Sequence, residues 1–450
     1  MKKTKLSLLI GLMTFLPLTT QANSLLDVYE LALQNDAQLK ADKARYDADK
    51  EYQYLNRAGL LPTVTANASV TTGDSESTDK LTNITTTTDS DGQSWDISLN
   101  QTLFDMSAWY SYKQGKKLSA QAEAQFGADQ QSLIVRVATA YFNVLRSVDI
   151  LEASIAEEKA YGKQLEQTKQ RFEVGLTAIT EVHEAQAAYD SALAGKLEAQ
   201  GNMEINYEAL EVLTGKPEDQ VAPLMATFPV IEPTPTNRAD WVEFALKNNY
   251  GLKAAKLRAD AQLDKAKSNK ADHLPTLGAN IKYSDSSRDI NGSPFDTNEG
   301  TSASINLKVP LYSGGLTSAS TRQAYAQFTQ YQETYNKTQR DVIQGARASH
   351  LSVETGVARV QARKQAIVSS QSALEATQSG YEVGTRNLVE VLLAQRNLYQ
   401  ARRNYSDALY DYVIDTVKLR EVAGMLTPAD VQEIDKWLLK DKLVNRSQYE

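Results

Sequence analysis

The sequence predicts a mainly helical protein in which four strands per chain cross a membrane as part of a barrel shared between several chains. Three observations lead to this fold class: a pattern that occurs twice along the chain, two pairs of alternating strands, and two very long stretches without proline. The composition agrees, because only 22 glycines and 11 prolines occur among 450 residues, below the roughly 12% of average usage. Long, uninterrupted elements are therefore expected.

The first residues predict export. A basic start at residues 1–5 is followed by a mostly apolar stretch from Leu6 to Leu18, and Thr20 and Ala22 are small residues at the positions that a signal peptidase reads. We predict a signal peptide over residues 1–22; a retained anchor helix is the alternative, although the stretch is short for a bilayer. Removal takes away three lysines and no acids, which changes the formal charge from −8 to −11. This acidic balance argues against a nucleic-acid partner.

Prolines divide the chain. None lies between Pro62 and Pro217 or between Pro310 and Pro428, whereas five lie between residues 217 and 235. Since proline interrupts helices and central strands, the cluster predicts an irregular, proline-rich linker over residues 217–240. The two proline-free stretches predict long regular elements.

The linker separates two copies of one pattern. Aligning residue 28 with residue 241 matches many positions without a gap, and Leu61-Pro62-Thr63 corresponds to Leu274-Pro275-Thr276. Such internal similarity indicates a tandem duplication. We predict a first structural repeat over residues 23–216, a second over 241–427 and a C-terminal tail over 428–450. In each repeat the sequence predicts, in order, a helix, a pair of strands, a very long helix and a further helix.

The strand pairs alternate apolar and polar residues, which predicts one apolar and one polar face. The expected strands cover about residues 63–72, 94–104, 276–284 and 302–311, with polar loops over 73–92 and 284–301. A soluble hairpin gives the same alternation. A membrane barrel is favoured because each expected strand has the length that crosses a bilayer, its polar face is largely uncharged, and aromatic residues lie toward the strand ends. These aromatic residues are Trp95, Phe104, Trp109, Tyr283 and Tyr312.

Four strands cannot close a barrel, and an open edge is not tolerated in lipid. Two chains would give eight strands and three chains twelve. Eight strands leave an interior filled by side chains, whereas more strands leave a passage. A conducting role therefore favours three chains.

Residues 107–172 predict one helix of roughly 100 Å. Its apolar residues alternate in steps of three and four, as in a coiled coil: Ile134, Val137, Tyr141, Val144, Val148, Leu151 and Ile155. A seven-residue spacing recurs at Val391, Leu398, Tyr405, Tyr412 and Leu419. A plain helical bundle explains either stripe alone. Two long copies on a chain with membrane strands favour a tube of packed helices.

Several longer segments resemble the TolC family of trimeric outer-membrane exit ducts. They include Leu103-Phe104-Asp105-Met106-Ser107, Arg171-Phe172-Glu173-Val174-Gly175-Leu176, His273-Leu274-Pro275-Thr276-Leu277 and Gly380-Tyr381-Glu382-Val383-Gly384-Thr385-Arg386. The resemblance extends from about Leu26 to Thr427. It implies a homotrimer with a twelve-stranded barrel in the Gram-negative outer membrane, continued by a twelve-helix barrel across the periplasm. It also implies a periplasmic adaptor and a proton-driven or ATP-driven inner-membrane pump as partners.

The resemblance assigns a role to two helix-to-helix turns at the periplasmic end. Their residues, Val174, Gly175, Leu176, Val383, Gly384 and Thr385, match the family's contact points for the adaptor. Glycine at the centre supplies the backbone freedom of a tight turn. The alternative is a plain interhelical loop.

Next to these turns the resemblance implies a gate latch. Thr180 and Glu181 match positions that bond, in the family, to those of Arg386 and Tyr381. Tyr381 can donate a hydrogen bond to the Glu181 carboxylate, and Arg386 has forked donors for the oxygens of Thr180. The family has Asp where Glu181 stands, so the reach differs by one methylene group.

Glu390 matches the first of two acidic residues that ring the family's closed entrance, whereas Leu393 replaces the second. Three carboxylates in a trimer, rather than six, predict weaker block of conductance by multivalent cations. The alternative is a solvated glutamate at a helix end.

The sequence offers no support for catalysis or a cofactor. His183, His273 and His350 are isolated, and no phosphate-binding, dinucleotide-binding or nucleophile motif occurs. The expected function is a passive exit duct for efflux pumps and type I secretion, with outer-membrane lipid around its barrel. The alternative is a membrane-anchored periplasmic coiled-coil protein with a structural or adhesive role and no pore.

Overall fold

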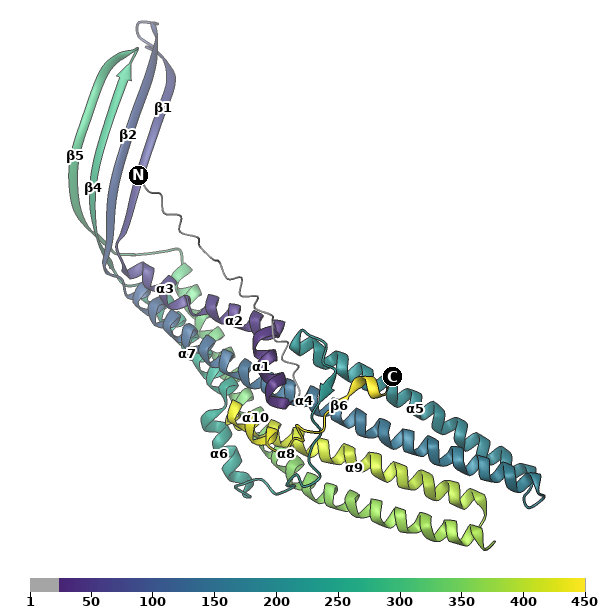
Figure 1. Ribbon diagram of the computed structural model, residues 1–450. Helices are drawn as coiled ribbons and strands as arrows, with labels where there is room; N and C mark the ends of the chain where they lie inside the picture. Colours follow the sequence, from purple (N-terminus) through teal and green to yellow (C-terminus); the bar gives the residue numbers. More distant parts are fainter. Residues whose placement is uncertain (1–23, 450) are drawn as a thin grey trace, which may run out of the picture.

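The computed structural model describes residues 24–449, so the predicted signal peptide lies outside the described residues. Helices form an elongated body, and four long strands rise from one end of it (Figure 1). The N-terminal half contains α1 Leu25–Asn35, α2 Ala37–Asp49, α3 Tyr52–Arg57, β1 Thr63–Thr78, β2 Thr85–Phe104, α4 Met106–Glu173 and α5 Ile179–Thr214. The C-terminal half contains α6 Arg238–Asn248, α7 Tyr250–Ala271, β4 Thr276–Ile290, β5 Ser293–Lys308, α8 Leu316–Glu382 and α9 Leu388–Val422.

The four long strands form one antiparallel sheet in the order β1–β2–β4–β5. The pairing of β2 with β4 joins the two halves of the chain. One face of the sheet is apolar across neighbouring strands, since Leu99 lies opposite Val64 on one side and Ile281 on the other. Within the described chain, β1 and β5 each pair along one side only.

The strands are longer than predicted, and most of the two expected polar loops belongs to them. The hairpins turn only at residues 79–84 and 291–292, so residues 73–78, 85–92, 284–290 and 293–301 continue the strands. Alternation of apolar and polar residues stops in these segments because both faces are polar there. Backbone pairing continues regardless of polarity, and threonine-rich runs such as residues 85–88 favour extended structure.

The longer strands also move two aromatic residues away from the strand ends. Trp95 and Tyr283 lie near the middle of β2 and β4, and their ring centroids are 5.2 Å apart. Their predicted position at the strand ends is therefore wrong. Phe104 does end β2, at the junction with the helical body.

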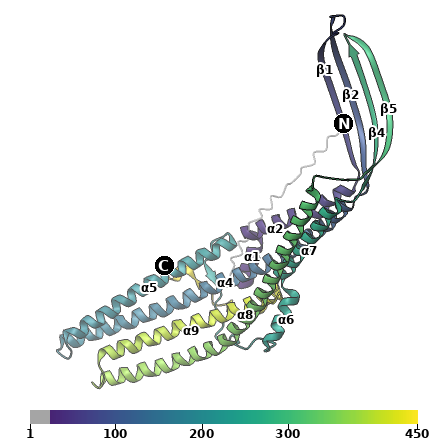
Figure 2. The same cartoon turned by 180° about the vertical axis from the view of Figure 1, so that it is seen from behind.

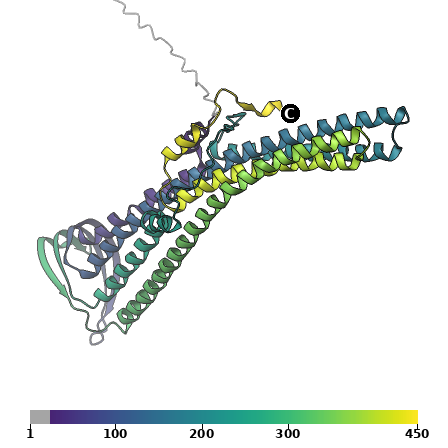
Figure 3. The ribbon, with the colours of Figure 1, turned by 90° about the horizontal axis from the view of Figure 1, so that it is seen from below.

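Two very long helices form the body, and α4 confirms the predicted helix over residues 107–172. At 68 and 67 residues, α4 and α8 each extend about 100 Å. Each returns through a tight turn into a shorter helix, α5 or α9. Seen from below, the pairs α4–α5 and α8–α9 run side by side (Figure 3). No helix within residues 24–449 combines the length and the apolar character that crossing a bilayer requires.

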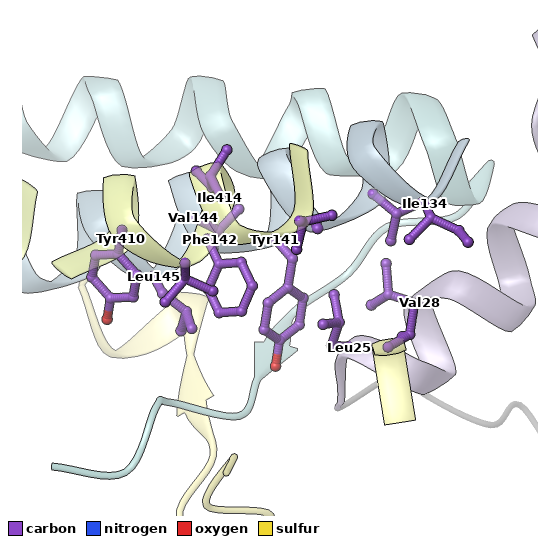
Figure 4. Packing of buried hydrophobic residues seen from close by; sticks show 14 of the residues in the cluster. Leu25, Val28, Ile134, Tyr141, Phe142, Val144, Leu145, Tyr410 and Ile414 are labelled. Carbon is purple, nitrogen blue, oxygen red and sulfur yellow. The ribbon is translucent and has the colours of Figure 1, made fainter. Parts of the chain in front are cut away.

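The predicted heptad stripe of α4 lies in the core. Tyr141, Phe142, Val144 and Leu145 pack with Ile414 of α9 and with residues of α1 (Figure 4). The Tyr141 hydroxyl donates to the carbonyl of Ala222 at 2.8 Å, so this buried polar group is satisfied. The core therefore ties the long helices to the middle of the body.

The predicted linker and tail pack together beside this core. The linker contributes β3 Gln220–Val221, which pairs with β6 Val444–Asn445 of the tail, and the tail adds the helix α10 Pro428–Asp435. Arg446, which follows β6, donates from Nε to Glu204 of α5 at 2.6 Å. The tail thus braces α5 against the body, an arrangement that the sequence alone did not indicate.

Candidate functional site

The two helix-to-helix turns lie at the end of the molecule farthest from the sheet (Figure 2). One turn connects α4 with α5 over residues 174–178, and the other connects α8 with α9 over residues 383–387. We call this end the tip. It contains every residue for which the sequence predicted a gate or adaptor role.

Both turns have the same backbone geometry. Gly175 has a φ of 75° and Gly384 a φ of 77°, in the left-handed region that side chains other than glycine rarely adopt. The amide of Leu176 donates to the carbonyl of Arg171, and the amide of Thr385 to that of Gly380, each at 2.8 Å. These bonds close the ends of α4 and α8 in the Schellman manner. Glycine at each centre is therefore a geometric requirement.

Each turn presents apolar side chains to solvent. Val174 and Leu176 are 70% and 69% exposed, and Val383 is 75% exposed. Apolar groups gathered at the end of a long rod have no partner within the described chain. Such exposed groups mark an interaction surface.

The predicted contact between Tyr381 and Glu181 is present. The Tyr381 hydroxyl, at the end of α8, donates to Glu181 Oε2, at the start of α5, at 3.2 Å. Burial, together with the charge of Glu181, raises the pKa of Tyr381, against the opposing effect of Arg171. The phenol therefore keeps its proton and acts as a donor. The Arg171 guanidinium lies 5.0 Å from the centre of the Tyr381 ring, which holds the ring from α4.

Arg386 has a different partner from the predicted one. Its Nη1 donates to Glu390 Oε2, in the first turn of α9, at 2.6 Å. Within residues 24–449, no hydrogen bond joins Arg386 to Thr180, which is exposed. The physical reason is proximity, because a carboxylate four residues away competes better for the guanidinium than a hydroxyl on another helix.

Glu390, the predicted ring residue, lies in the first turn of α9. Asn387 caps this helix by accepting from the Glu390 amide at 3.0 Å, a contact that sequence analysis missed. The signal was available, since Asn directly before an apolar run with Glu three residues later is typical of a helix start. Leu393, at the position for which the resemblance implies a second acid, is exposed about one turn further along α9.

A seam of polar contacts joins α4 to α9 above the tip. The hydroxyl of Tyr161 donates to the carbonyl of Leu392, and that of Tyr399 donates to the carbonyl of Ala156, both at 3.1 Å. Arg403 donates to Glu157 at 2.5 Å. Sequence analysis missed these contacts because their partners lie more than 230 residues apart along the chain. The seam holds the two coiled pairs together.

Asp149 lies at the upper end of this seam. Its carboxylate accepts from the hydroxyls of Tyr410 at 3.1 Å and Ser406 at 3.2 Å. Burial raises the pKa of Asp149 to about 6, although these two hydrogen bonds oppose the shift.

The three histidines lie on separate parts of the chain, His183 in α5, His350 in α8 and His273 in the connection from α7 to β4. His350 of α8 contacts the carbonyl of Thr236 through Nε2 at 3.0 Å, which is a structural role. Across residues 24–449, no three histidine or acidic side chains are grouped closely enough to hold a metal ion. The tip thus offers hydrogen-bond donors, hydrogen-bond acceptors and exposed apolar side chains.

A sheet whose half nearest the helices has an apolar face, carried on a long bundle whose far end closes through tight turns, is the architecture of an outer-membrane channel protein. Comparison with known families agrees. The family model for the outer membrane efflux protein matches residues 28–216 and 241–425, and the chain belongs to this family.

Relatives with similar lengths extend this result. Outer membrane protein TolC of Vibrio cholerae is 38% identical over 421 residues, which cover 93% of this chain and 94% of that protein. TolC of Escherichia coli is 33% identical over 457 residues, 98% of this chain and 91% of that protein. The proteases secretion protein PrtF of Dickeya chrysanthemi is 30% identical over 437 residues, 95% of this chain and 94% of that protein.

Solved structures share the fold. CusC covers 89% of this chain and 92% of its own, with a TM-score of 0.77 at 16% identity. VceC of Vibrio cholerae covers 89% of this chain and 96% of its own, with a TM-score of 0.75 at 20% identity. The chain is an outer-membrane efflux or secretion duct protein, and the predicted location in the Gram-negative outer membrane is confirmed. The adhesive or structural alternative is not favoured.

Proposed function

We propose that three copies of the chain form a passive duct, with a twelve-stranded barrel in the outer membrane and a twelve-helix barrel across the periplasm. The support is the sheet, which pairs along one side only at both β1 and β5. Because an open edge cannot lie in lipid, β5 of one copy has to pair with β1 of the next. Three copies then supply twelve strands, enough for a passage.

The part of the sheet nearest the helices has the dimensions of a membrane band. From Trp95 to Phe104 the strand β2 advances about 30 Å, and a tilt of about 40° reduces this to about 23 Å along the membrane normal. This length matches the apolar band of about 25 Å in outer-membrane barrels. We assign Trp95 and Tyr283 to one interface and Phe104 to the other. The polar outer half of each hairpin then extends beyond the membrane.

The tip serves as the gate in this proposal. The Tyr381–Glu181 bond ties α8 to α5 and keeps the tip closed, while Arg386 holds Glu390 in the acidic ring. In this proposal Thr180 is a second acceptor for Arg386, which pairs with Glu390 in the structure. Opening requires these polar contacts to be exchanged for contacts with a partner.

That partner is a periplasmic adaptor, which joins the duct to a proton-driven or ATP-driven inner-membrane pump. The exposed turns, Val174-Gly175-Leu176 and Val383-Gly384-Thr385, supply an apolar docking surface at the height where such a partner would approach. Two relatives are named for protease secretion, PrtF of Dickeya chrysanthemi and AprF of Pseudomonas aeruginosa. These relatives favour a role in type I secretion as well as in multidrug efflux. Energy would come from the pump.

We also propose the domain division expected from the sequence. The two repeats over residues 23–216 and 241–427 each contribute two strands and a coiled pair to the duct. The linker over residues 217–240 and the tail over 428–450 pack against the helices at the middle of the duct. A signal peptide over residues 1–22 would be removed on export.

The exposed apolar turns are the observation on which the adaptor role depends, and substitution tests it. Leu176→Asp with Val383→Asp should abolish binding of a purified adaptor and restore drug sensitivity in a strain that depends on this protein. Leu81→Asp, at an exposed apolar residue of the opposite end, is the matched control and should do neither. Unchanged adaptor binding in the tip variant would show that the turns are not the docking surface.

A further inference from the structure

Three arginines gather on one lateral edge of the chain, where α6 packs against α8. Arg340 and Arg347 lie seven residues apart on α8, and Arg238 begins α6. They line a hollow of about 490 Å³ whose wall includes the apolar side chain of Leu351. Within residues 24–449, the one ion pair of these arginines is a long contact of 3.9 Å from Arg238 to Glu354. We call this hollow the arginine hollow. Its three positive charges have too few acidic partners among the described residues of the same chain.

The opposite lateral edge of the chain, formed by α5, is negatively charged. Among the four helices that reach the tip the packing order is α5, α4, α9 and α8, so α5 and α8 are the outer two of these four, and α6 packs on α8. The sequence of α5 contains seven acidic residues and one lysine. Near its C-terminal end, Glu211 precedes Val212, whose side chain is 77% exposed, and the last carbonyl groups add the negative end of the helix dipole.

The hollow and this helix end lie at the same height above the tip. The last residue of α5, Thr214, is 35 residues from the start of that helix, and Arg347 is 35 residues before the end of α8. Both therefore lie about 52 Å from the tip. Contacts between neighbouring helices show that an equal number of residues from the tip means an equal height. Tyr449 bonds both Gln200 of α5 and Glu152 of α4, and each of these two residues lies 21 residues from its turn.

We propose that the arginine hollow of one subunit receives the C-terminal end of α5 from the next subunit, with Glu211 paired to the arginines and Val212 packed against Leu351. This inference rests on the proposed trimer. The α8 edge lies on the same side of the chain as β5, and the α5 edge on the side of β1 (Figure 1). Closing the ring through β5 and β1 therefore brings α8 of one copy beside α5 of the next. Rotation about an axis along the helices leaves every residue at its own height.

Proximity can be tested directly because the chain has no cysteine. Val212→Cys combined with Leu351→Cys, treated with a short bis-maleimide, should give covalently linked dimers and trimers on a denaturing gel. Val212→Cys combined with Val368→Cys is the matched control and should give none. Val368 is exposed on the same helix, but it lies 17 residues nearer the tip, a distance of about 25 Å.

The outcomes separate this inference from the proposed function. A trimeric wild-type protein whose Val212/Leu351 pair does not cross-link would overturn the inference and leave the duct intact. A wild-type protein that is monomeric in detergent would overturn both. Cross-linking with the Val212/Leu351 pair alone would support the inference.

Charge reversal tests the chemistry of the contact. Arg340→Glu with Arg347→Glu should lower the temperature at which the trimer dissociates by several degrees, and the addition of Glu211→Arg should recover much of the loss. Lys364→Glu, thirteen residues beyond Leu351 and so on the opposite side of α8, should have no effect. Unchanged trimer dissociation in the double reversal, with loss of binding to purified cell-wall fragments, would assign the hollow to cell-wall carboxylates and overturn the inference.

Discussion

Tyr381→Phe should make the closed tip open more often, because it removes one hydroxyl and leaves the ring in place. The bond from Tyr381 to Glu181 is 3.2 Å long and has a charged acceptor. Hydrogen bonds to charged groups contribute about 1.5–3 kcal/mol when buried, and partial exposure at the tip reduces this to about 1 kcal/mol. Three equivalent bonds in the proposed trimer would sum to about 3 kcal/mol. Since about 1.4 kcal/mol corresponds to a factor of ten, the open population should rise about a hundredfold.

Single-channel recording in a planar bilayer measures this effect as the fraction of time spent at high conductance. Tyr399→Phe is the matched control, because its hydroxyl also donates across the bundle, to the carbonyl of Ala156 at 3.1 Å, but joins α9 to α4 above the tip. The control should keep the wild-type open fraction. An unchanged open fraction in Tyr381→Phe, with normal trimer assembly, would refute the latch.

Three further predictions concern the gate charge, the turn and the seam. Leu393→Asp should lower the concentration of a multivalent cation that blocks conductance, by about tenfold for three added charges; Glu390→Ala should weaken the block, and an unaffected block would remove Glu390 from the entrance. Gly384→Ala should cost about 1–2 kcal/mol because of its φ of 77°, measured as a lower midpoint of chemical unfolding in detergent; an unchanged midpoint would contradict a strained turn. For Asp149, whose folded pKa of about 6 lies above its unfolded value of 3.8, the folded state binds the proton more tightly, so stability should fall by about 2 kcal/mol per chain as the pH rises from 4 to 7. Asp149→Asn should flatten this pH dependence, and an equal slope in both proteins would show that Asp149 is not its source.

The long helices were predictable from the sequence because their signal is local and repeated. Residues 107–172 contain no proline, and a heptad spacing extends from Ile134 to Ile155. Both signals favour a helix over many turns, and α4 confirms the prediction. The strand ends were not predictable in the same way. Alternation identifies a strand only while its two faces differ, so the polar outer halves of the hairpins looked like loops.

The contacts of the tip differ in how far apart their partners lie along the chain, and this separation decides which of them the sequence could predict. Arg386 lies in the turn before α9 and Glu390 in the first turn of that helix, so a separation of only four residues brings the two side chains together. Tyr381 and Glu181 are 200 residues apart, and only the resemblance to a family brought them together. The arginine hollow needed the structure, because α6 and α8 meet through tertiary packing that no local pattern describes.

Conductance of the purified wild-type protein in a planar lipid bilayer tests the central claim most directly. The account predicts discrete channels formed by a particle with the mass of three chains, mostly closed in the absence of partners, and blocked from the tip side by multivalent cations. A trimer that inserts into the bilayer but never conducts, even when Tyr381→Phe releases the tip, would contradict a duct.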